Sequence, residues 1–192
     1  AHLADRDDFR FVQQDIADLE AGDPAFDGVE RVFHLGAMAD IVPSIQQPLI
    51  YHRANVDGTV AVLECARAAG VARLVYAASS SCYGIPDIYP TPESAAIRPM
   101  YPYALTKYLG EQYVMHWAQT YGMSCVSLRF FNVFGPRQDP NGAYAAVIPK
   151  WTAAMIQGDT VRIESTGDPK TAADYQKNVE RTVKVWRVAG AS

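Results

Sequence analysis

Hydroxyl, phenol and ammonium side chains occur in this sequence at a spacing that could carry out proton transfer. Tyr103 and Lys107 are four residues apart, so on a helix they would share a face, one turn apart. A phenol has a pKa of about 10, and a neighbouring ammonium favours its ionised form, so Tyr103 could act as a base near neutral pH. Three consecutive serines at residues 79–81 follow an apolar run. A hydroxyl from such a neighbouring strand could hydrogen-bond the same substrate oxygen.

Both features also have simpler interpretations. Serine clusters are frequent in turns, because their hydroxyls satisfy backbone groups of the loop. A tyrosine and a lysine four residues apart are common on helices, and Lys107 could simply be solvated. Tyr101 and Tyr108 are competing phenols, but neither is followed by a lysine four residues later. The elements around these residues decide between the interpretations.

An alternation of apolar runs and amphipathic stretches indicates a parallel sheet with helices packed on it. Short apolar runs predict strands at residues 10–15, 29–36, 72–79 and 124–131. Helical spacing predicts helices at residues 54–70 and 103–122, each ending at a glycine that suits a C-terminal cap. The nearly continuous apolar character of the last two strands predicts that both are buried. Strands and helices in this order are typical of an α/β, Rossmann-like fold.

Polar and small residues then gather at one edge of the predicted sheet. The serines of residues 79–81 lie at the carboxyl end of one strand, and Gly36 and Ala37 lie at the end of the strand before it. Asn132 follows the next strand along the chain. Ligands of parallel sheets bind beyond the carboxyl ends of the strands. This placement favours a catalytic role for the serines over a turn alone.

Composition and charge argue against several other classes of protein. The 192 residues are about the length of one domain, and a net charge of −4 provides no basic surface for nucleic acid. No apolar run is long enough to span a bilayer, and the first ten residues do not read as a signal peptide. Three scattered cysteines do not predict disulfides, and His34, with no second potential ligand at metal spacing, does not predict a metal site. These features predict a cytoplasmic protein without a nucleic-acid, membrane or metal partner.

The motifs and their order resemble the extended short-chain dehydrogenase/reductase family. Ser79 followed by Tyr103-x-x-x-Lys107 is similar to the catalytic set of that family. Blocks similar to its nucleotide-sugar epimerases are HLGAMADIVPSIQQP (34–48), ANVDGTVAVLECAR (54–67), YAASSSCYG (76–84), YPYALTKYLGE (101–111) and LRFFNVFGPRQDPNGAYAAVIPKW (128–151). The resemblance runs from about residue 9 to about residue 158. It is closest to UDP-N-acetylglucosamine and UDP-glucose 4-epimerases of the polysaccharide-building type.

The resemblance implies NAD as the cofactor and a transient oxidation of the sugar at C4. Tyr103 would take the proton of the sugar 4-hydroxyl while hydride passes from C4 to NAD. Lys107 would hold the nicotinamide ribose and lower the pKa of Tyr103, and Ser79 would hydrogen-bond the same hydroxyl. The positions that match cofactor-binding residues are Asp15, Ile16, Leu35, Gly36, Ala37, Asn55, Lys107 and Phe130. The positions that match contacts to a UDP-sugar substrate are Ser80, Ser81 and Asn132.

Two further implications of the resemblance concern the reaction and the assembly. Related 4,6-dehydratases carry Asp-Glu where Ser80 and Ser81 stand, because eliminating water needs an extra acid and base. UDP-glucuronate decarboxylases keep a glutamate at the position of Ser81, so epimerisation is favoured over another dehydratase or reductase reaction. Family members often pair through helices that match residues 54–69 and 101–121, which implies a homodimer through a helix bundle.

The chain departs from the family pattern at both ends. The family begins with a strand, a GxxGxxG turn and a helix that binds the cofactor pyrophosphate, and no such stretch is present here. Ala173 stands where the family has an arginine that clamps the diphosphate. We therefore expect residues 1–135 to be a partial NAD-binding domain, incomplete at its N-terminal strand, and residues 136–192 to be a partial substrate-binding region. The alternative is a truncated, non-catalytic homologue that does not bind NAD.

Overall fold

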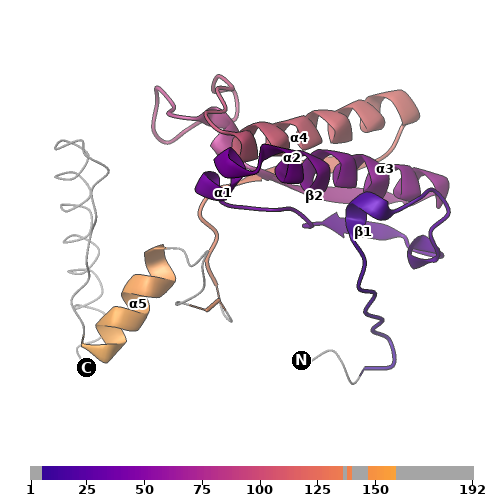
Figure 1. Cartoon of the computed structure of the whole chain (residues 1–192), viewed down its shortest axis with the longest axis horizontal. Coiled ribbons are helices and arrows are strands. Elements are labelled where there is room, and N and C mark those ends of the chain that lie inside the picture. Colours follow the sequence, from indigo (N-terminus) through magenta and orange to yellow (C-terminus); the bar gives the residue numbers. More distant parts are fainter. Residues whose placement is uncertain (1–5, 136–137, 140–146, 159–192) are drawn as a thin grey trace. The chain divides into compact units, whose positions relative to one another are not determined.

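A computed structural model describes residues 6–135, 138–139 and 147–158. The chain divides into two compact units, Ala1–Val133 and Phe134–Ser192. The first unit holds the sheet, and in the second the structure describes the helix α5 (Val147–Gln157) (Figure 1). Ala173 and most of the predicted region 136–192 lie outside the described residues.

A three-stranded parallel sheet forms the centre of the first unit. The strands β1 (Arg31–His34), β2 (Arg73–Ser79) and β3 (Cys125–Phe130) are hydrogen-bonded in that order. Phe33 is in register with Val75, and Val75 with Val126. Three of the four predicted strands and the Rossmann-like parallel arrangement are therefore confirmed.

The fourth predicted strand, at residues 10–15, does not form among the described residues. This segment pairs with no described strand, and Phe11 is 75% exposed. A strand is stable only where its backbone N–H and C=O groups pair with a neighbouring strand. Asp15 instead caps the short 3-10 helix η1 (Ile16–Asp18), because its Oδ1 accepts the N–H of Ala17 at 3.0 Å.

Both predicted helices are confirmed. Besides η1, the described helical elements of the unit are η2 (Pro24–Phe26), α1 (Ile41–Gln46), α2 (Pro48–His52), the π-helical turn η3 (Arg53–Asp57), α3 (Gly58–Ala68), the 3-10 turn η4 (Ser80–Tyr83) and α4 (Pro102–Tyr121). The predicted helix at residues 54–70 corresponds to η3 and α3 in succession. Gly70 and Gly122 follow α3 and α4 with φ angles of 67° and 68°. This left-handed conformation, which glycine adopts without strain, ends both helices where the sequence predicted.

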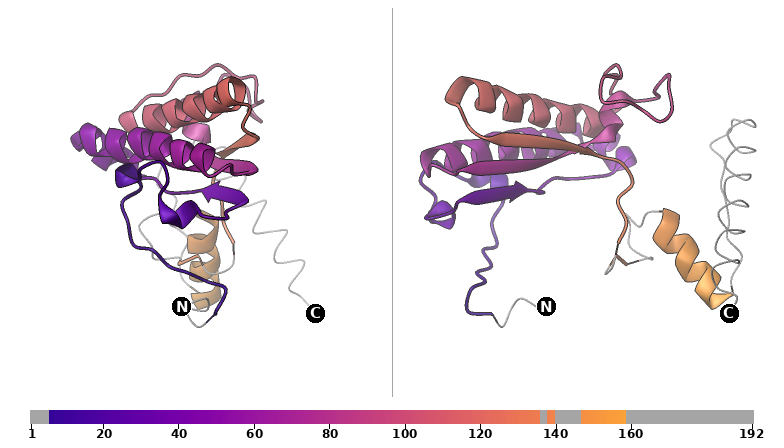
Figure 2. Two further views of the ribbon diagram at one scale, coloured as in Figure 1. Left: turned by 90° about the vertical axis from the view of Figure 1, so that its right-hand side faces the viewer. Right: turned by 180° about the vertical axis from the view of Figure 1, so that it is seen from behind.

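Helices α3 and α4 lie side by side and cover one face of the sheet (Figures 1 and 2). Leu63 of α3, Leu74 and Tyr76 of β2 and Val114 of α4 are fully buried in the core between these layers. The apolar side chains exposed on the opposite face are Phe33, Val126, Leu128 and Phe130. The prediction that β3 is a buried strand is therefore wrong, because only alternate residues of this edge strand face the helices.

The buried face of α4 carries small and charged residues. Ala104, Lys107, Gly110 and Glu111 point inward, whereas Leu105 is 46% exposed. A Cβ at Gly110 would collide with the phenol oxygen of Tyr76, so only glycine allows the helix to approach β2 this closely. This close approach brings the backbone of α4 beside the end of β2.

Candidate active site

A cavity of about 430 Å³ lies at the carboxyl ends of β2 and β3. It is lined by Leu35, Ala37, Ala39, Ile41, Ala77, Ala78, Ser79, Ser80, Ser81, Tyr101, Tyr103, Lys107, Phe130, Phe131 and Asn132. We call it the serine cavity. All the predicted catalytic and substrate-binding residues line it, although they come from separate segments of the chain. No aspartate or glutamate is among these described lining residues.

Ser79 is both a turn residue and a cavity residue. It ends β2 and caps η4, since its Oγ accepts the N–H of Ser81 at 3.2 Å. The same Oγ lies 3.0 Å from the Oγ of Ser81, to which it can donate. The turn fixes a pair of hydroxyls at the cavity wall, so the two interpretations of the serine triplet are compatible.

Tyr103 lies in the first turn of α4, one turn before Lys107. The helix begins at Pro102, a residue whose fixed φ suits the first helical position. The ring of Tyr103 stacks on that of Tyr101, with centroids 6.5 Å apart and an angle of 6° between the planes. Both phenols line the serine cavity, so Tyr101 is an alternative candidate to Tyr103 for proton transfer there.

Lys107 is a buried cation whose charge no described carboxylate neutralises. Its side chain is 3% exposed, and no ion pair joins it to a described aspartate or glutamate. Burial lowers the pKa of this ammonium to about 8, so it remains largely charged at neutral pH. A buried donor of this kind at a cavity wall suits a ligand with several hydroxyl oxygens, as the ribose of a dinucleotide has.

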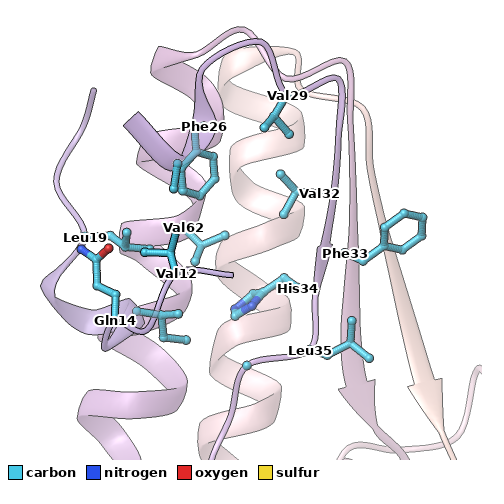
Figure 3. A pocket seen from close by; sticks show the side chains of 13 residues that line it. Val12, Gln14, Leu19, Phe26, Val29, Val32, Phe33, His34, Leu35 and Val62 are labelled. Carbon is cyan, nitrogen blue, oxygen red and sulfur yellow. The ribbon is translucent and has the colours of Figure 1, made fainter. Parts of the chain in front are cut away.

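A second cavity, of about 340 Å³, lies beside β1 (Figure 3). It contains Ile16, Leu35 and Gly36 among its lining residues, and Leu35 also lines the serine cavity. The side chain of Ile16 packs closely over Gly36 and Gly58, where a Cβ would lie 3.0 Å and 2.8 Å from its atoms. Six of the eight predicted cofactor residues are therefore divided between two cavities, which share Leu35.

His34 lies in the wall of the second cavity but is engaged within the protein. Its Nε2 is 2.9 Å from the hydroxyl of Thr59, which itself donates to the carbonyl of Asn55. The Thr59 oxygen can therefore accept a hydrogen bond from the Nε2–H of His34. Burial, together with the charge of Lys107, lowers the pKa of His34 to about 4, so the imidazole is neutral at physiological pH.

Two predicted cofactor residues line neither cavity. Asp15 is exposed at the start of η1, with a carboxyl oxygen 3.9 Å from Arg53. Asn55 is fully buried, and its Oδ1 accepts the N–H of Met38 at 2.7 Å. Its Nδ2 donates to the Met38 carbonyl and to the hydroxyl of Thr106, each at 3.0 Å. This amide thus ties the segment that follows β1 to the first turns of α4.

An ion pair that sequence reasoning missed links three elements behind the serines. Arg129 of β3 contacts Glu111 of α4 at 2.6 Å, and the Glu111 side chain is 6% exposed. The same guanidinium donates to the phenol oxygen of Tyr83 at 2.8 Å and to the Glu93 carbonyl at 3.3 Å. Glu111 follows Lys107 by four residues, so helical spacing could have indicated that both face inward.

The described residues contain neither a membrane-crossing helix nor a group of three potential metal ligands. No described helix is both long and apolar enough to span a bilayer. The search for clusters of histidine, cysteine, aspartate and glutamate likewise covers the described part of the chain and finds none.

Comparisons with known proteins agree with this arrangement. The model of the NAD dependent epimerase/dehydratase family matches residues 1–176. A UDP-glucose 4-epimerase of Mycolicibacterium smegmatis is 38% identical over 91% of this chain and 56% of its own length. The UDP-N-acetylglucosamine 4-epimerase of Methanobrevibacter ruminantium, solved with UDP-N-acetylmuramic acid, is 35% identical with a TM-score of 0.72. That alignment covers 81% of this chain and 50% of the solved one.

A dehydratase is also among the similar structures. A double mutant of the dTDP-glucose 4,6-dehydratase of Streptomyces venezuelae, solved with NAD bound, is 30% identical with a TM-score of 0.71. The alignment covers 86% of this chain and 50% of the solved one. The chain spans about half the length of the curated relatives it matches. Because the family model matches residues 1–176 and these relatives are 30% or more identical, the chain belongs to the NAD-dependent epimerase/dehydratase family.

Proposed function

We propose that this chain carries the catalytic centre of an NAD-dependent 4-epimerase that acts on UDP-glucose or UDP-N-acetylglucosamine. The observation that carries the proposal is the convergence of Ser79, Tyr103 and Lys107 on one cavity with no described carboxylate in its wall. Relatives with 35 to 38% identity are named UDP-glucose 4-epimerases.

The residues of the two cavities fit the proposed cofactor. Lys107 offers a buried ammonium for ribose hydroxyls, and Leu35, Gly36 and Ala37 lie along the edge that joins the cavities. Ile16 offers an apolar contact for the adenine, and Phe130 lies in the wall of the serine cavity. NAD, when bound, supplies reversible hydride transfer at the sugar C4. Asp15 and Asn55 would support the cofactor site indirectly. Asp15 would do so by capping η1, and Asn55 by holding the backbone of Met38.

The protein side chains would transfer the proton and orient the sugar. Tyr103 would take the proton of the 4-hydroxyl as the general base, with Lys107 one turn away on the same helix. Ser79 would hydrogen-bond the same oxygen and keep it in place when the proton leaves. The resulting 4-keto sugar would turn over in the cavity to present the other face of C4, and Tyr103 would then return the proton to the same 4-oxygen. Asn132 would contact the diphosphate of the substrate, and Ser80 and Ser81 the sugar.

The lining residues favour epimerisation over dehydration. Elimination of water across C5 and C6 requires an acid and a base besides Tyr103. Ser80 and Ser81 have hydroxyls that remain un-ionised at physiological pH. Dehydratases with 29 to 30% identity share the fold, so the choice between the two reactions depends on these side chains.

The assembly that we propose is a homodimer in which α3 and α4 form a helix bundle. Support comes from the outer side of α4, where Leu105 and Tyr113 are 46% and 38% exposed. The ring of Trp117 contacts that of Tyr113, and its indole N–H donates to Glu64 of α3 at 2.8 Å. The two helices would therefore present one connected surface to a partner.

The experiment that tests the proposal combines binding and turnover. Native mass spectrometry of the purified chain should show one NAD per chain, and UDP-glucose should then be converted to its C4 epimer. A substrate deuterated at C4 should keep its label in the product, because the hydride returns to the carbon from which it came. A chain that binds no NAD and converts neither UDP-glucose nor UDP-N-acetylglucosamine would instead be the non-catalytic homologue.

A further inference from the structure

The ammonium of Lys107 has an aromatic neighbour instead of an anionic one. Its Nζ lies over the ring of Tyr76, 4.3 Å from the ring centroid. A cation within about 6 Å of a ring face is attracted by the negative quadrupole of the ring, most strongly where water is excluded. Both side chains meet this condition, since Tyr76 is fully buried and Lys107 is 3% exposed.

Several contacts fix Tyr76 in this position. Its hydroxyl donates to the backbone carbonyl of Lys107 at 3.3 Å, and the absence of a side chain at Gly110 leaves room for it. The ring of His34 lies 5.3 Å away. Burial raises the pKa of the Tyr76 phenol, so it remains neutral and interacts with the ammonium through the ring face.

The titratable groups around this pair leave the charge of Lys107 uncompensated. From β1, His34 is neutral at physiological pH for the reasons given above. From α4, Glu111 is paired with Arg129 of β3, and Tyr103 lies one turn before Lys107. Among the described side chains, the aromatic face of Tyr76 therefore stabilises the ammonium, and it does so without occupying any of its three N–H donors.

We propose that Tyr76 is a positioning residue that holds the Lys107 ammonium at the wall of the serine cavity through its ring face. A carboxylate in this place would neutralise the charge and take N–H donors away from a ligand. The ring leaves both the charge and the N–H donors of Lys107 available to the cofactor ribose and to the reacting groups in the cavity. This inference deepens the proposed function and rests on it.

The test varies the ring electrostatics at nearly constant shape. Tyr76→Phe removes the hydroxyl and keeps the ring, and mono-, di- and trifluorinated phenylalanine at position 76 then weaken the quadrupole stepwise. The pKa of Lys107 is read by NMR from its side-chain signals in the ligand-free chain. We expect it to fall with each fluorine, by about one unit over the series, which is tenfold in proton affinity. The dissociation constant of NAD should rise in the same order.

The outcomes separate this inference from the proposed function. A Lys107 pKa that is equal in all the fluorinated variants would overturn the inference, and so would a falling pKa with unchanged NAD affinity. Urea unfolding of the same variants is the packing control, because they bury nearly the same surface. If the pKa follows the series while the unsubstituted chain binds no NAD, the contact between Tyr76 and Lys107 is right and the proposed function is wrong.

Discussion

Lys107, which we propose binds the cofactor, reduces the stability of the fold because its charge is buried. The ammonium is 3% exposed, and desolvation lowers its pKa from 10.5 to about 8. The ring of Tyr76 only partly replaces the lost hydration. Without a described carboxylate partner, the charged form is less stable in the folded chain than in the unfolded one.

Replacing this charge should stabilise the protein in a pH-dependent way. Between about pH 8 and pH 10.5 the unfolded chain binds more protons at Lys107 than the folded chain, so the free energy of unfolding of the wild type rises with pH there. Lys107→Met removes the titration at similar volume. We expect the variant to be more stable below pH 8 by about 3 kcal/mol, an advantage that shrinks towards pH 10.5. Urea unfolding measured across this range checks the prediction, and a constant difference between the two proteins would contradict it.

Ser79 should affect both the turn and the reaction. Ser79→Ala removes the side-chain cap of η4, which should cost about 1 kcal/mol of unfolding free energy. It also removes the hydroxyl proposed to hold the substrate oxygen, so the rate of epimerisation should fall about a hundredfold. Ser124→Ala, at an exposed position before β3, is the matched control and should leave the rate unchanged. Equal rates for the two variants would rule out a role for Ser79 in the reaction.

At the scale of elements, the ion pair between Glu111 and Arg129 links α4 to β3 behind the serines. The guanidinium also reaches Tyr83 in η4. Removing one partner of a buried pair leaves the other charge uncompensated, which is more damaging than breaking an exposed pair. The geometry at the end of β2 therefore depends on this contact.

Arg129→Leu should accordingly reduce the free energy of unfolding by about 3 to 5 kcal/mol in urea. Arg98→Leu breaks the exposed pair with Asp87 and should change it by less than about 1 kcal/mol. Adding Glu111→Leu to Arg129→Leu should recover part of the loss, because no buried charge then remains. A loss at Arg129 as small as that at Arg98 would show that the buried pair is unimportant.

Much of the secondary structure and of the site could be predicted because their signals are local. Apolar runs and terminal glycines predicted three strands and two helices. The strand ends and the family resemblance indicated the catalytic and substrate-binding residues that line the serine cavity, namely Ser79, Ser80, Ser81, Tyr103, Lys107 and Asn132. The segment at residues 10–15 has the composition of a strand, but a strand needs a pairing partner that composition does not reveal. The contact of Tyr76 with Lys107 depends on how closely α4 approaches β2, and that is a tertiary property.

At the scale of the whole molecule, the outer side of α4 allows a test of the proposed assembly. Leu105→Glu places a charge on the outer side of α4 without touching the core, since Leu105 is 46% exposed. We expect the wild type to sediment as a dimer and the variant as a monomer of the same folded stability. Arg67→Glu would not serve as a control, because it also breaks the exposed pair with Glu64. Gln13→Glu, at an exposed position outside α3 and α4, adds the same charge and should remain dimeric. A monomeric wild type would refute this assembly.

The central claim is that Tyr103 transfers the proton while its neighbour Tyr101, stacked in the same cavity, does not. The most direct measurement is the rate at which the NAD-loaded chain converts UDP-glucose to UDP-galactose, compared for Tyr103→Phe and Tyr101→Phe. We predict that Tyr103→Phe loses a factor of about 10² to 10⁴ and that Tyr101→Phe stays within about tenfold of the wild type. Full activity of Tyr103→Phe, or the larger loss in Tyr101→Phe, would contradict the account.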